Sequence, residues 1–582
     1  MDIDIQKSSW PDIIAAVDNL DREHELDSGK FIVDLHGNCT VDQFAPAIKA
    51  ALYQRNIAPF IRQGDYDTYL QELSSSSTGL GAREPDLGLV ILHSENLCVI
   101  DTVGDIDQPL TEERLEMLLG LLADRKYPVA VTNLSWPFFS SNFDSGRNEL
   151  FIQELNLKLA QAVTASPSLW MIDLHMYAAS IGNANAFDRR SWFRYKAPYS
   201  LDLIRSVSGA IGHIGSDLRG QSKKCLILDC DNTIWGGIIG EDGPENIKLD
   251  AHSYPGNVFY KFQQQIKALE QRGVMIALAS KNNEEDVLEV LNNHPHCVLK
   301  PDDLVGHRIN WDNKPSNVAD LVQSLNIGLD SVVFIDDSDV ECELMRQALP
   351  TVTTIQVPKK LSELPSILPA AKLFSPRPPT REDTSRTRMY RETASRNKAE
   401  KNFKSIDDFL GSLDIVANID RANQANIPRI SQLFARTNQF MLTAYRPSEA
   451  DLSELANRDD AFVYALRSSD KFGDLGVIGA LVLDKADDAI VVKSFALSCR
   501  GLGRKLEDVF FEVAVKHAAN VCGARTIHSC YQSSKKNAQV SDLYDRYGLT
   551  KAAELDDGTQ YHGQIDDIAI EVPSFIKVES NV

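Results

Sequence analysis

The segment Leu226-Ile-Leu-Asp-Cys-Asp-Asn-Thr-Ile-Trp-Gly-Gly, residues 226–237, places two carboxylates directly after a short apolar run. An apolar run of this kind predicts a strand buried inside a parallel sheet. Asp229 and Asp231 are two positions apart, so an extended backbone points both side chains to the same side. Two like charges this close are costly unless a cation or protons neutralise them. The segment therefore predicts an acidic site at the end of a strand.

Three further polar groups stand at ends of predicted elements in the same region. Ser280 and the pair Asp336-Asp337 follow apolar runs, and Lys314 opens a predicted helix. Ligands of open α/β sheets bind at the carboxyl ends of the strands, so we expect these side chains to converge. A lone aspartate at a strand end usually only caps the next turn. Four polar groups in this order favour a functional site instead.

This order of residues resembles the haloacid dehalogenase-like (HAD) superfamily of phosphoryl-transfer enzymes. The resemblance implies that Asp229 attacks phosphorus and that Asp231 first protonates the leaving oxygen and then deprotonates water. It also implies a Mg²⁺ cofactor held by Asp229, Asp231 (through its backbone) and Asp336. Ser280 and Lys314 would bind the phosphoryl oxygens. The expected core is a Rossmann-like sheet.

Four segments carry a narrower resemblance, to the FkbH-like, class IIIC branch of that superfamily; they are residues 232–243, 280–283, 310–314 and 334–341. Members of this branch are associated with polyketide biosynthesis. They move a glyceryl unit from 1,3-bisphosphoglycerate to an acyl carrier protein and remove a phosphate. The resemblance implies a Mg²⁺-dependent phosphatase and glyceryl transferase. Its partners would be an acyl carrier protein with its phosphopantetheine arm and a phosphorylated three-carbon metabolite.

Two departures from that branch, and one short segment, bear on this expectation. The branch often has Asn-Pro where this chain has Ser338-Asp339, and some members carry a cysteine where this chain has Ala279. The second departure puts a thioester relay at this position in doubt. Only about a dozen residues separate Gly237 from Leu249, which predicts a minimal cap and an open site. Two alternatives therefore stay open: a HAD phosphatase or acyltransferase for another phosphorylated metabolite or glycan precursor, and a non-catalytic carrier-protein interaction module.

Residues 1–215 alternate strand-like runs with helical patterns, which predicts a parallel sheet covered on both faces. The triplet Gly-Asn-Cys at 37–39 is similar to a degraded nucleophile block of the SGNH hydrolase-like region of FkbH-like proteins. Cys39 is thus a candidate nucleophile, with His175 as a conceivable partner. The alternative is that Cys39 packs in the core and His175 lies at the surface. Thr-Asn at 132–133 has the same two interpretations.

The region 405–575 combines long strand pairs with a helix that follows a glycine-containing turn, which predicts an α+β domain. Its turn resembles the pyrophosphate-binding loop of GNAT acyltransferases, where backbone amides at a helix start face the ligand. We expect the same loop here to bind a phosphopantetheine arm, or else to be a structural turn. Tyr544 is a candidate proton donor to a leaving thiolate. The candidate arm-binding residues are Arg500, Gly501, Gly503 and Arg504.

Length and charge bound the remaining expectations. A chain of 582 residues is too long for one core, and the motifs divide it into domains at 1–215, 216–372 and 405–582 with a linker at 373–404. Sixty basic and 82 acidic residues give a net charge of −22, which argues against nucleic-acid or membrane partners. Nine scattered cysteines and no long apolar run predict a cytoplasmic protein with reduced thiols.

The linker is basic in this acidic chain, and it has two interpretations. It could steer an acidic carrier protein, or it could be a solvated connection. The cations concerned are Arg386, Arg388, Arg391, Arg396, Lys398 and Lys401.

Overall fold

Contacts divide the computed structural model into two compact units, Met1–Arg219 and Gly220–Val582. The boundaries of the three predicted domains stay predictions. Among the described residues, no helix is both long and apolar enough to cross a membrane. The structure describes residues 5–581 except for 6–7, 26–28, 76–78, 82, 101–104, 136–146, 167, 378–387, 391, 393–395, 397–402, 404, 535, 556–557 and 569.

The first unit contains a parallel sheet whose strands, in the described part of the unit, run in the order β2-β1-β3-β4-β5. This confirms the predicted parallel sheet. The sequence did not reveal β2, an edge strand that begins with proline and has polar, partly exposed residues. The strands are β1 (Phe31–Gly37), β2 (Pro59–Gln63), β3 (Leu87–Ile91), β4 (Val129–Thr132) and β5 (Leu169–Ile172).

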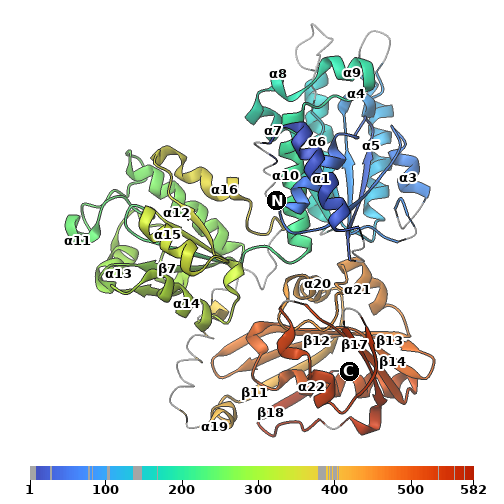
Figure 1. Ribbon diagram of the computed structural model, residues 1–582, viewed down its shortest axis with the longest axis vertical. Coiled ribbons are helices and arrows are strands. Elements are labelled where there is room, and N and C mark those ends of the chain that lie inside the picture. The colour runs from blue at the N-terminus through green and yellow to red at the C-terminus, as the bar shows by residue number, and fades with distance from the viewer. Residues whose placement is uncertain are drawn as a thin grey trace. The chain divides into compact units, whose positions relative to one another are not determined.

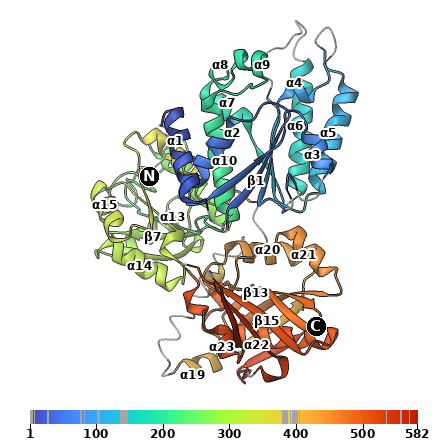
Figure 2. The same ribbon diagram turned by 45° about the vertical axis from the view of Figure 1, so that its right-hand side comes forward.

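Helices cover both faces of this sheet, and each face has its own apolar cluster (Figure 2). One face carries α1 (Trp10–Glu23), α2 (Phe44–Tyr53), α7 (Leu174–Ile181) and α10 (Leu201–Leu218). The other carries α3 (Tyr69–Ser75), α5 (Gln108–Ala123) and α6 (Arg147–Ala165). Short helices complete the unit; they are α4 (Ser94–Leu97), α8 (Asn183–Ala186) and α9 (Arg189–Tyr195).

The second unit begins with another parallel sheet, ordered β10-β9-β6-β7-β8 in the part of the chain that the structure describes. The sequence did not reveal β8, whose glycine, histidine and arginine interrupt its apolar pattern. The strands are β6 (Cys225–Leu228), β7 (Met275–Ser280), β8 (Leu304–Ile309), β9 (Val332–Asp336) and β10 (Thr353–Gln356).

Alternate residues of β6 point to opposite faces of this sheet, as the two-residue period of a strand requires. Leu226 and Leu228 pack with α12 (Gly256–Gln271) and α13 (Glu284–Asn293). Cys225 and Ile227 pack with α14 (Lys314–Ser324) and α15 (Asp339–Ala348). Both faces are therefore covered, and the polar ends of the strands are left for a site (Figure 1).

The same unit continues with a mixed sheet, ordered β16-β17-β15-β14-β13-β12-β11-β18 in the described residues. The pairs β14–β15 and β11–β18 are parallel and the others antiparallel, which confirms the α+β class expected here. The strands are β11 (Ile415–Arg421), β12 (Ala461–Asp470), β13 (Gly473–Ala486), β14 (Ala489–Leu497), β15 (Thr526–Gln532), β16 (Thr550–Leu555), β17 (Gly558–Gln564) and β18 (Ile576–Ser580).

The long helix α22 (Leu506–Cys522) packs on one face of the mixed sheet. Helices α20 (Ile427–Arg436) and α21 (Glu449–Ala456) pack on the other. Two short helices, α19 (Ile406–Gly411) and α23 (Leu543–Arg546), contribute to the apolar cluster of α22, and α16 (Ile367–Ala371) packs in the cluster of α12. The described residues therefore form an α/β protein with two parallel sheets and one mixed sheet.

Both interpretations of the linker are wrong for Arg396, because both require an exposed side chain. Its side chain is 1% exposed, and Nε and Nη2 donate to the carboxylate of Asp470 at 2.5 and 2.8 Å. Arg396 is therefore a buried anchor on β12 and is not available to steer a partner. Arg388 is exposed and lies 3.8 Å from Glu392. The remaining linker cations, Arg386, Arg391, Lys398 and Lys401, lie outside the described residues.

Candidate active site

The predicted acidic site forms at the carboxyl edge of the parallel sheet β10-β9-β6-β7-β8. Asp229 directly follows β6, and Asp336 is the last residue of β9, its parallel neighbour. One carboxylate oxygen from each of Asp229, Asp336 and Asp337 lies within 4.8 Å of the other two. The parallel register brings these residues together, although more than 100 positions separate Asp229 from the other two. The predicted convergence of strand-end aspartates is thus observed.

Lys314, the first residue of α14, reaches into this group. Its Nζ lies 2.9 Å from Asp229 Oδ1 and 2.6 Å from Asp336 Oδ2, and all three side chains are buried. Burial raises the pKa of Asp229 to about 7, against the opposing charge of Lys314. Burial would lower the pKa of Lys314, but the two carboxylates outweigh it and hold that pKa above its usual value. One ammonium thus partly neutralises the acidic cluster.

Ser280 and Asn282 extend the site from the end of β7. The Ser280 hydroxyl donates to Asp229 Oδ1 at 2.7 Å, which fixes the carboxylate that the sequence predicts as nucleophile. Asn282 Nδ2 donates to Ser280 Oγ at 3.0 Å and to Asp231 Oδ2 at 3.1 Å. Asn282 therefore connects the two aspartates of the first motif. Asn282 had no predicted role, although it lies in segment 280–283, which resembles the FkbH-like branch.

The carboxylate of Asp231 has a different setting from that of Asp229. Its Oδ1 accepts hydrogen bonds from Trp235 Nε1 at 2.9 Å and from the backbone amide of Ile239 at 3.2 Å. The carboxylate cluster contains Asp337 and not Asp231. The predicted role of Asp231 as a backbone ligand stays a prediction. Asp337 belongs to the predicted pair Asp336-Asp337, but only Asp336 of that pair was a predicted metal ligand.

The donor set fits a hard divalent cation. Three carboxylates against one ammonium leave about two uncompensated negative charges, which a divalent ion would neutralise. Carboxylate oxygens are the ligands that Mg²⁺ prefers, whereas zinc sites usually include histidine or cysteine. Asp229, Asp336 and Asp337 would hold the ion.

The segment after the first motif is short, as predicted. Helix α11 (Ile239–Asp242) spans one turn, and an antiparallel bridge between Gly236 and Lys248 closes the segment. This excursion is too small to form a separate cap domain.

The candidate nucleophile of the first unit, Cys39, lies in a setting that suppresses its reactivity. The side chain is 1% exposed and packs in the apolar cluster of α2 and α10. Burial, with a smaller contribution from Asp67, raises the pKa of the Cys39 thiol far above its usual value. The thiol stays protonated at neutral pH, and the thiolate is the reactive form. His175 is exposed on α7. These observations favour the packing interpretation of Cys39.

Polar residues at the strand ends of this unit bond to neighbouring backbone and side-chain groups. Asn38 Nδ2 donates to the carbonyl of His93 at 2.9 Å, and its Oδ1 accepts from the His93 amide at 2.6 Å. The Thr132 hydroxyl accepts from the Leu92 amide at 2.8 Å. Asn133 likewise donates to the Asp173 carboxylate at 2.7 Å. Such bonds satisfy buried polar groups where parallel strands end, which is a structural role.

Most of the glycine-containing turn at residues 500–504 is held by contacts within the protein. Arg504 Nη1 lies 3.1 Å from the buried carboxylate of Asp470, and a Cβ on Gly501 would meet Ile478 at 3.0 Å. Gly503 has φ +74°, a conformation that favours glycine. Arg500 is buried and lines a separate cavity. Arg504 and Gly501 are thus held by protein contacts.

Tyr544 cannot act as an accessible proton donor in this structure. Its side chain is 1% exposed, and its ring packs 6.1 Å from that of Phe511 and 5.4 Å from that of Tyr561. Burial raises the pKa of the Tyr544 phenol far above its usual value. The residue is part of the core beneath α22, and the sequence interpretation of Tyr544 needs correction.

Comparison with solved structures supports the assignment of the phosphatase-like region. The N-terminal part of the protein BF1531 from Bacteroides fragilis, which contains a phosphatase domain and was crystallised with Mg, is 29% identical over 62% of this chain and 98% of its own, with a TM-score of 0.55. This chain therefore contains a phosphatase domain homologous to that of BF1531. No protein-family model and no curated protein matches the chain.

Parts of the chain also align with acetyltransferases. The ribosomal-protein-S18-alanine N-acetyltransferase from Escherichia coli is 12% identical over 26% of this chain and 94% of its own, with a TM-score of 0.21. A putative GNAT-family acetyltransferase from Desulfovibrio desulfuricans is 14% identical over 26% of this chain and 99% of its own, also at a TM-score of 0.21.

Proposed function

We propose that this chain is a Mg²⁺-dependent phosphatase and glyceryl transferase that loads a glyceryl unit from 1,3-bisphosphoglycerate onto an acyl carrier protein. The observation that carries the phosphatase part is the group formed by Asp229, Asp336, Asp337 and Lys314. The Mg bound by the homologous domain of BF1531 supports the choice of ion. The resemblance of the motifs to the FkbH-like branch supports the substrate.

Each residue has a defined part in the phosphatase reaction. Asp229 forms a new bond to phosphorus while the bond to the leaving oxygen breaks, and Asp231 gives that oxygen its proton. Asp231 then takes a proton from water, which attacks phosphorus and releases Asp229 and inorganic phosphate. Ser280 and Lys314 hold Asp229 Oδ1 in place at 2.7 and 2.9 Å. Bound Mg²⁺ supplies positive charge that offsets the phosphoryl oxygens.

The short segment after the first motif supports a substrate carried on a protein. A phosphopantetheine arm is long and thin, and a one-turn helix obstructs its approach less than a cap domain would. The same holds for a free phosphate ester, so the short segment alone does not choose between the two substrates.

A second function, a phosphatase without glyceryl transfer, is favoured by two residues. Ala279 stands where a relay cysteine occurs in some relatives, and Cys39 is buried with its pKa raised. Neither position then offers a reactive thiol to carry the glyceryl unit as a thioester. Direct transfer to the thiol of the carrier arm is the remaining route for the first function.

Intact-mass measurement of a phosphopantetheinylated carrier protein separates these functions. We expect one glyceryl adduct after incubation with the protein, Mg²⁺ and 1,3-bisphosphoglycerate. Asp229→Asn should leave a phosphoglyceryl adduct or none. Release of inorganic phosphate without any carrier adduct would favour the phosphatase alone. No Mg²⁺-dependent turnover of any phosphate ester would contradict both functions and leave a non-catalytic interaction module.

A further inference from the structure

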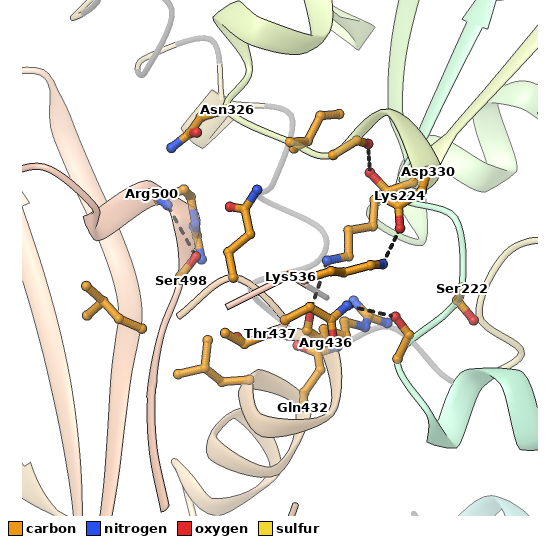
Figure 3. A pocket seen from close by; sticks show the side chains of 18 of the residues that line it. Ser222, Lys224, Asn326, Asp330, Gln432, Arg436, Thr437, Ser498, Arg500 and Lys536 are labelled. Atoms are coloured by element: carbon orange, nitrogen blue, oxygen red, sulfur yellow. Dashed lines mark hydrogen bonds and ion pairs between the residues drawn. The ribbon is translucent and has the colours of Figure 1, made fainter. Parts of the chain in front are cut away.

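A second cavity, of about 250 Å³, lies in the unit Gly220–Val582 away from the aspartates (Figure 3). Its walls come from the segment before β6, the turn before β9, the end of α20 with the residues after it, and the end of β14. Figure 3 shows Lys224, Arg436 and Lys536 close together, with Arg500 across the cavity from them.

This cavity is at the opposite edge of the sheet from the phosphatase site. Lys224 precedes β6, and its backbone continues the sheet: its amide donates to the Ser331 carbonyl at 2.7 Å, and its carbonyl accepts from Met275 at 2.9 Å. Asp229 follows the other end of β6. Five steps of about 3.3 Å put the two residues about 16 Å apart along the strand. A ligand in the cavity therefore does not occupy the acidic site.

The lining is cationic in an otherwise acidic chain. Among the lining residues that the structure describes, there are five cations and a single carboxylate, Asp330, which pairs with Lys536. The net charge of the whole chain is −22, so a local excess of about four positive charges is a strong departure. The cations are Lys224, Arg429, Arg436, Arg500 and Lys536.

Two of these guanidinium groups are buried, and taking a cation out of water is costly. Arg429 and Arg500 are 9% and 6% exposed. Several of the cations already donate to neutral groups: Lys224 Nζ donates to the Arg436 carbonyl at 2.8 Å, and Arg429 donates to the Gln432 side chain. Like charges gathered away from water are stabilised by a bound counter-anion.

We propose that this cavity binds the phosphoryl group of a small phosphate ester. A guanidinium group can donate two parallel hydrogen bonds to two oxygens of one phosphate, and a lysine ammonium adds a further positive charge. Ser498 and Thr437 add hydroxyl groups to the lining. The volume admits a phosphoryl group with a short chain, since sites for drug-sized ligands begin at about 300 Å³. The site does not depend on the glyceryl-transfer reaction proposed above.

The test is calorimetric binding of pyrophosphate to the full chain without divalent cations. We expect binding to weaken about tenfold in Arg436→Gln and in Lys536→Gln, because each removes one charge-assisted interaction. Lys577→Gln is the control, since Lys577 is exposed on β18 and outside the cavity. Hydrolysis of p-nitrophenyl phosphate with Mg²⁺ should stay unchanged in all three variants. Pyrophosphate binding equal to wild type in both cavity variants would overturn the proposal.

A measurement on the wild-type protein covers the case in which the variants misfold. Acylation of lysines, read by peptide mass spectrometry, should fall at least threefold at Lys224 or Lys536 when pyrophosphate is added, and should not change at Lys577. Equal labelling with and without pyrophosphate would overturn the site. Titrations with 3-phosphoglycerate and with 4′-phosphopantetheine then distinguish a free metabolite from a carrier arm as the source of the phosphate. Pantetheine without phosphate should not bind.

Discussion

Lys314 donates a hydrogen bond of 2.6 Å from Nζ to Oδ2 of Asp336, and both side chains are buried. The same ammonium lies 2.9 Å from Asp229 Oδ1, so it joins the ends of two parallel strands. Its position as the first residue of α14 holds it there, with Pro315 next to it at a helix start. A cation at this point permits two buried carboxylates to coexist before any metal binds.

Replacing Lys314 by methionine should destabilise the metal-free protein. The variant keeps the length of the side chain but leaves Asp229 and Asp336 without their shared ammonium. Removing one partner from a buried ionic group costs about 3–5 kcal/mol. We expect thermal unfolding in EDTA to show this loss and Mg²⁺ to restore part of it. Lys360→Met, which removes an exposed pair with Glu363, is the control and should cost less than about 1 kcal/mol.

Asp337 should set the Mg²⁺ requirement. It is the third carboxylate of the cluster, so Asp337→Asn removes charge from the ion site while leaving Asp229 in place. We expect the Mg²⁺ concentration for half-maximal phosphatase activity to rise about tenfold, the equivalent of about 1.4 kcal/mol of binding. Asp302→Asn changes an exposed carboxylate just before β8 and should leave the requirement unchanged. Equal Mg²⁺ requirements in the two variants would remove Asp337 from the ion site.

The Cys39 thiol should be dispensable for carrier loading. Its burial keeps it protonated, and its side chain fills space between helices. Cys39→Ala should therefore retain full loading by intact mass and lose only about 1 kcal/mol of stability from the lost packing. Loss of loading in a folded Cys39→Ala protein, with phosphatase activity intact, would restore the relay hypothesis.

Asp470 should be a stability residue of the last region. It is fully buried and accepts from Arg396 at 2.5 Å and from Arg504 at 3.1 Å. Asp470→Asn leaves two buried guanidinium groups without their anion, at a cost of about 3–5 kcal/mol. Chemical denaturation would measure the loss. Asp460→Asn removes an exposed pair with Arg458 and should cost less than about 1 kcal/mol.

The convergence of the acidic site was predictable because it follows from topology. Apolar runs located β6 and β9, and parallel strands bring their carboxyl ends to one edge, so Asp229 and Asp336 had to meet there. The choice between Asp231 and Asp337 was not predictable. It depends on the Trp235 indole and the Ile239 amide, which engage the Asp231 carboxylate. Neither donor has a pattern in the sequence that marks it as a partner.

The burial of Arg396 could not be predicted either, because its partner is distant in the sequence. Arg396 and Asp470 are 74 positions apart, and a basic run of residues gives no sign of a distant buried acid. The cationic cavity is likewise assembled from Lys224, Arg436 and Lys536, which lie in three separate segments. Strands such as β16, whose residues are all exposed, carry no apolar period to detect. Local sequence patterns predict helices and strands. Contacts between distant segments determine which charged side chains are buried and which ion pairs they form.

Glu507 should make stability fall as the pH rises. Its Oε2 is buried without a hydrogen-bond partner, and burial raises the pKa of this carboxyl group to about 7 from an ordinary 4.5. The folded state therefore binds more protons than the unfolded state between about pH 4.5 and 7, so folding weakens across that window. Above pH 7 the penalty is complete. Glu507→Gln removes the charge and should stabilise the protein there by about 2–3 kcal/mol.

Denaturant unfolding of the Glu507→Gln variant and of wild type at pH 4.5, 6 and 8 measures this effect. The difference between the two stabilities should be smallest near pH 4.5, where Glu507 is protonated in the folded state and half protonated in the unfolded state, and should grow toward pH 8. Glu554→Gln, an exposed position on β16, serves as the control and should give the same difference from wild type at every pH. A constant difference for Glu507→Gln across the three pH values would mean that folding does not shift the pKa of the Glu507 carboxyl group.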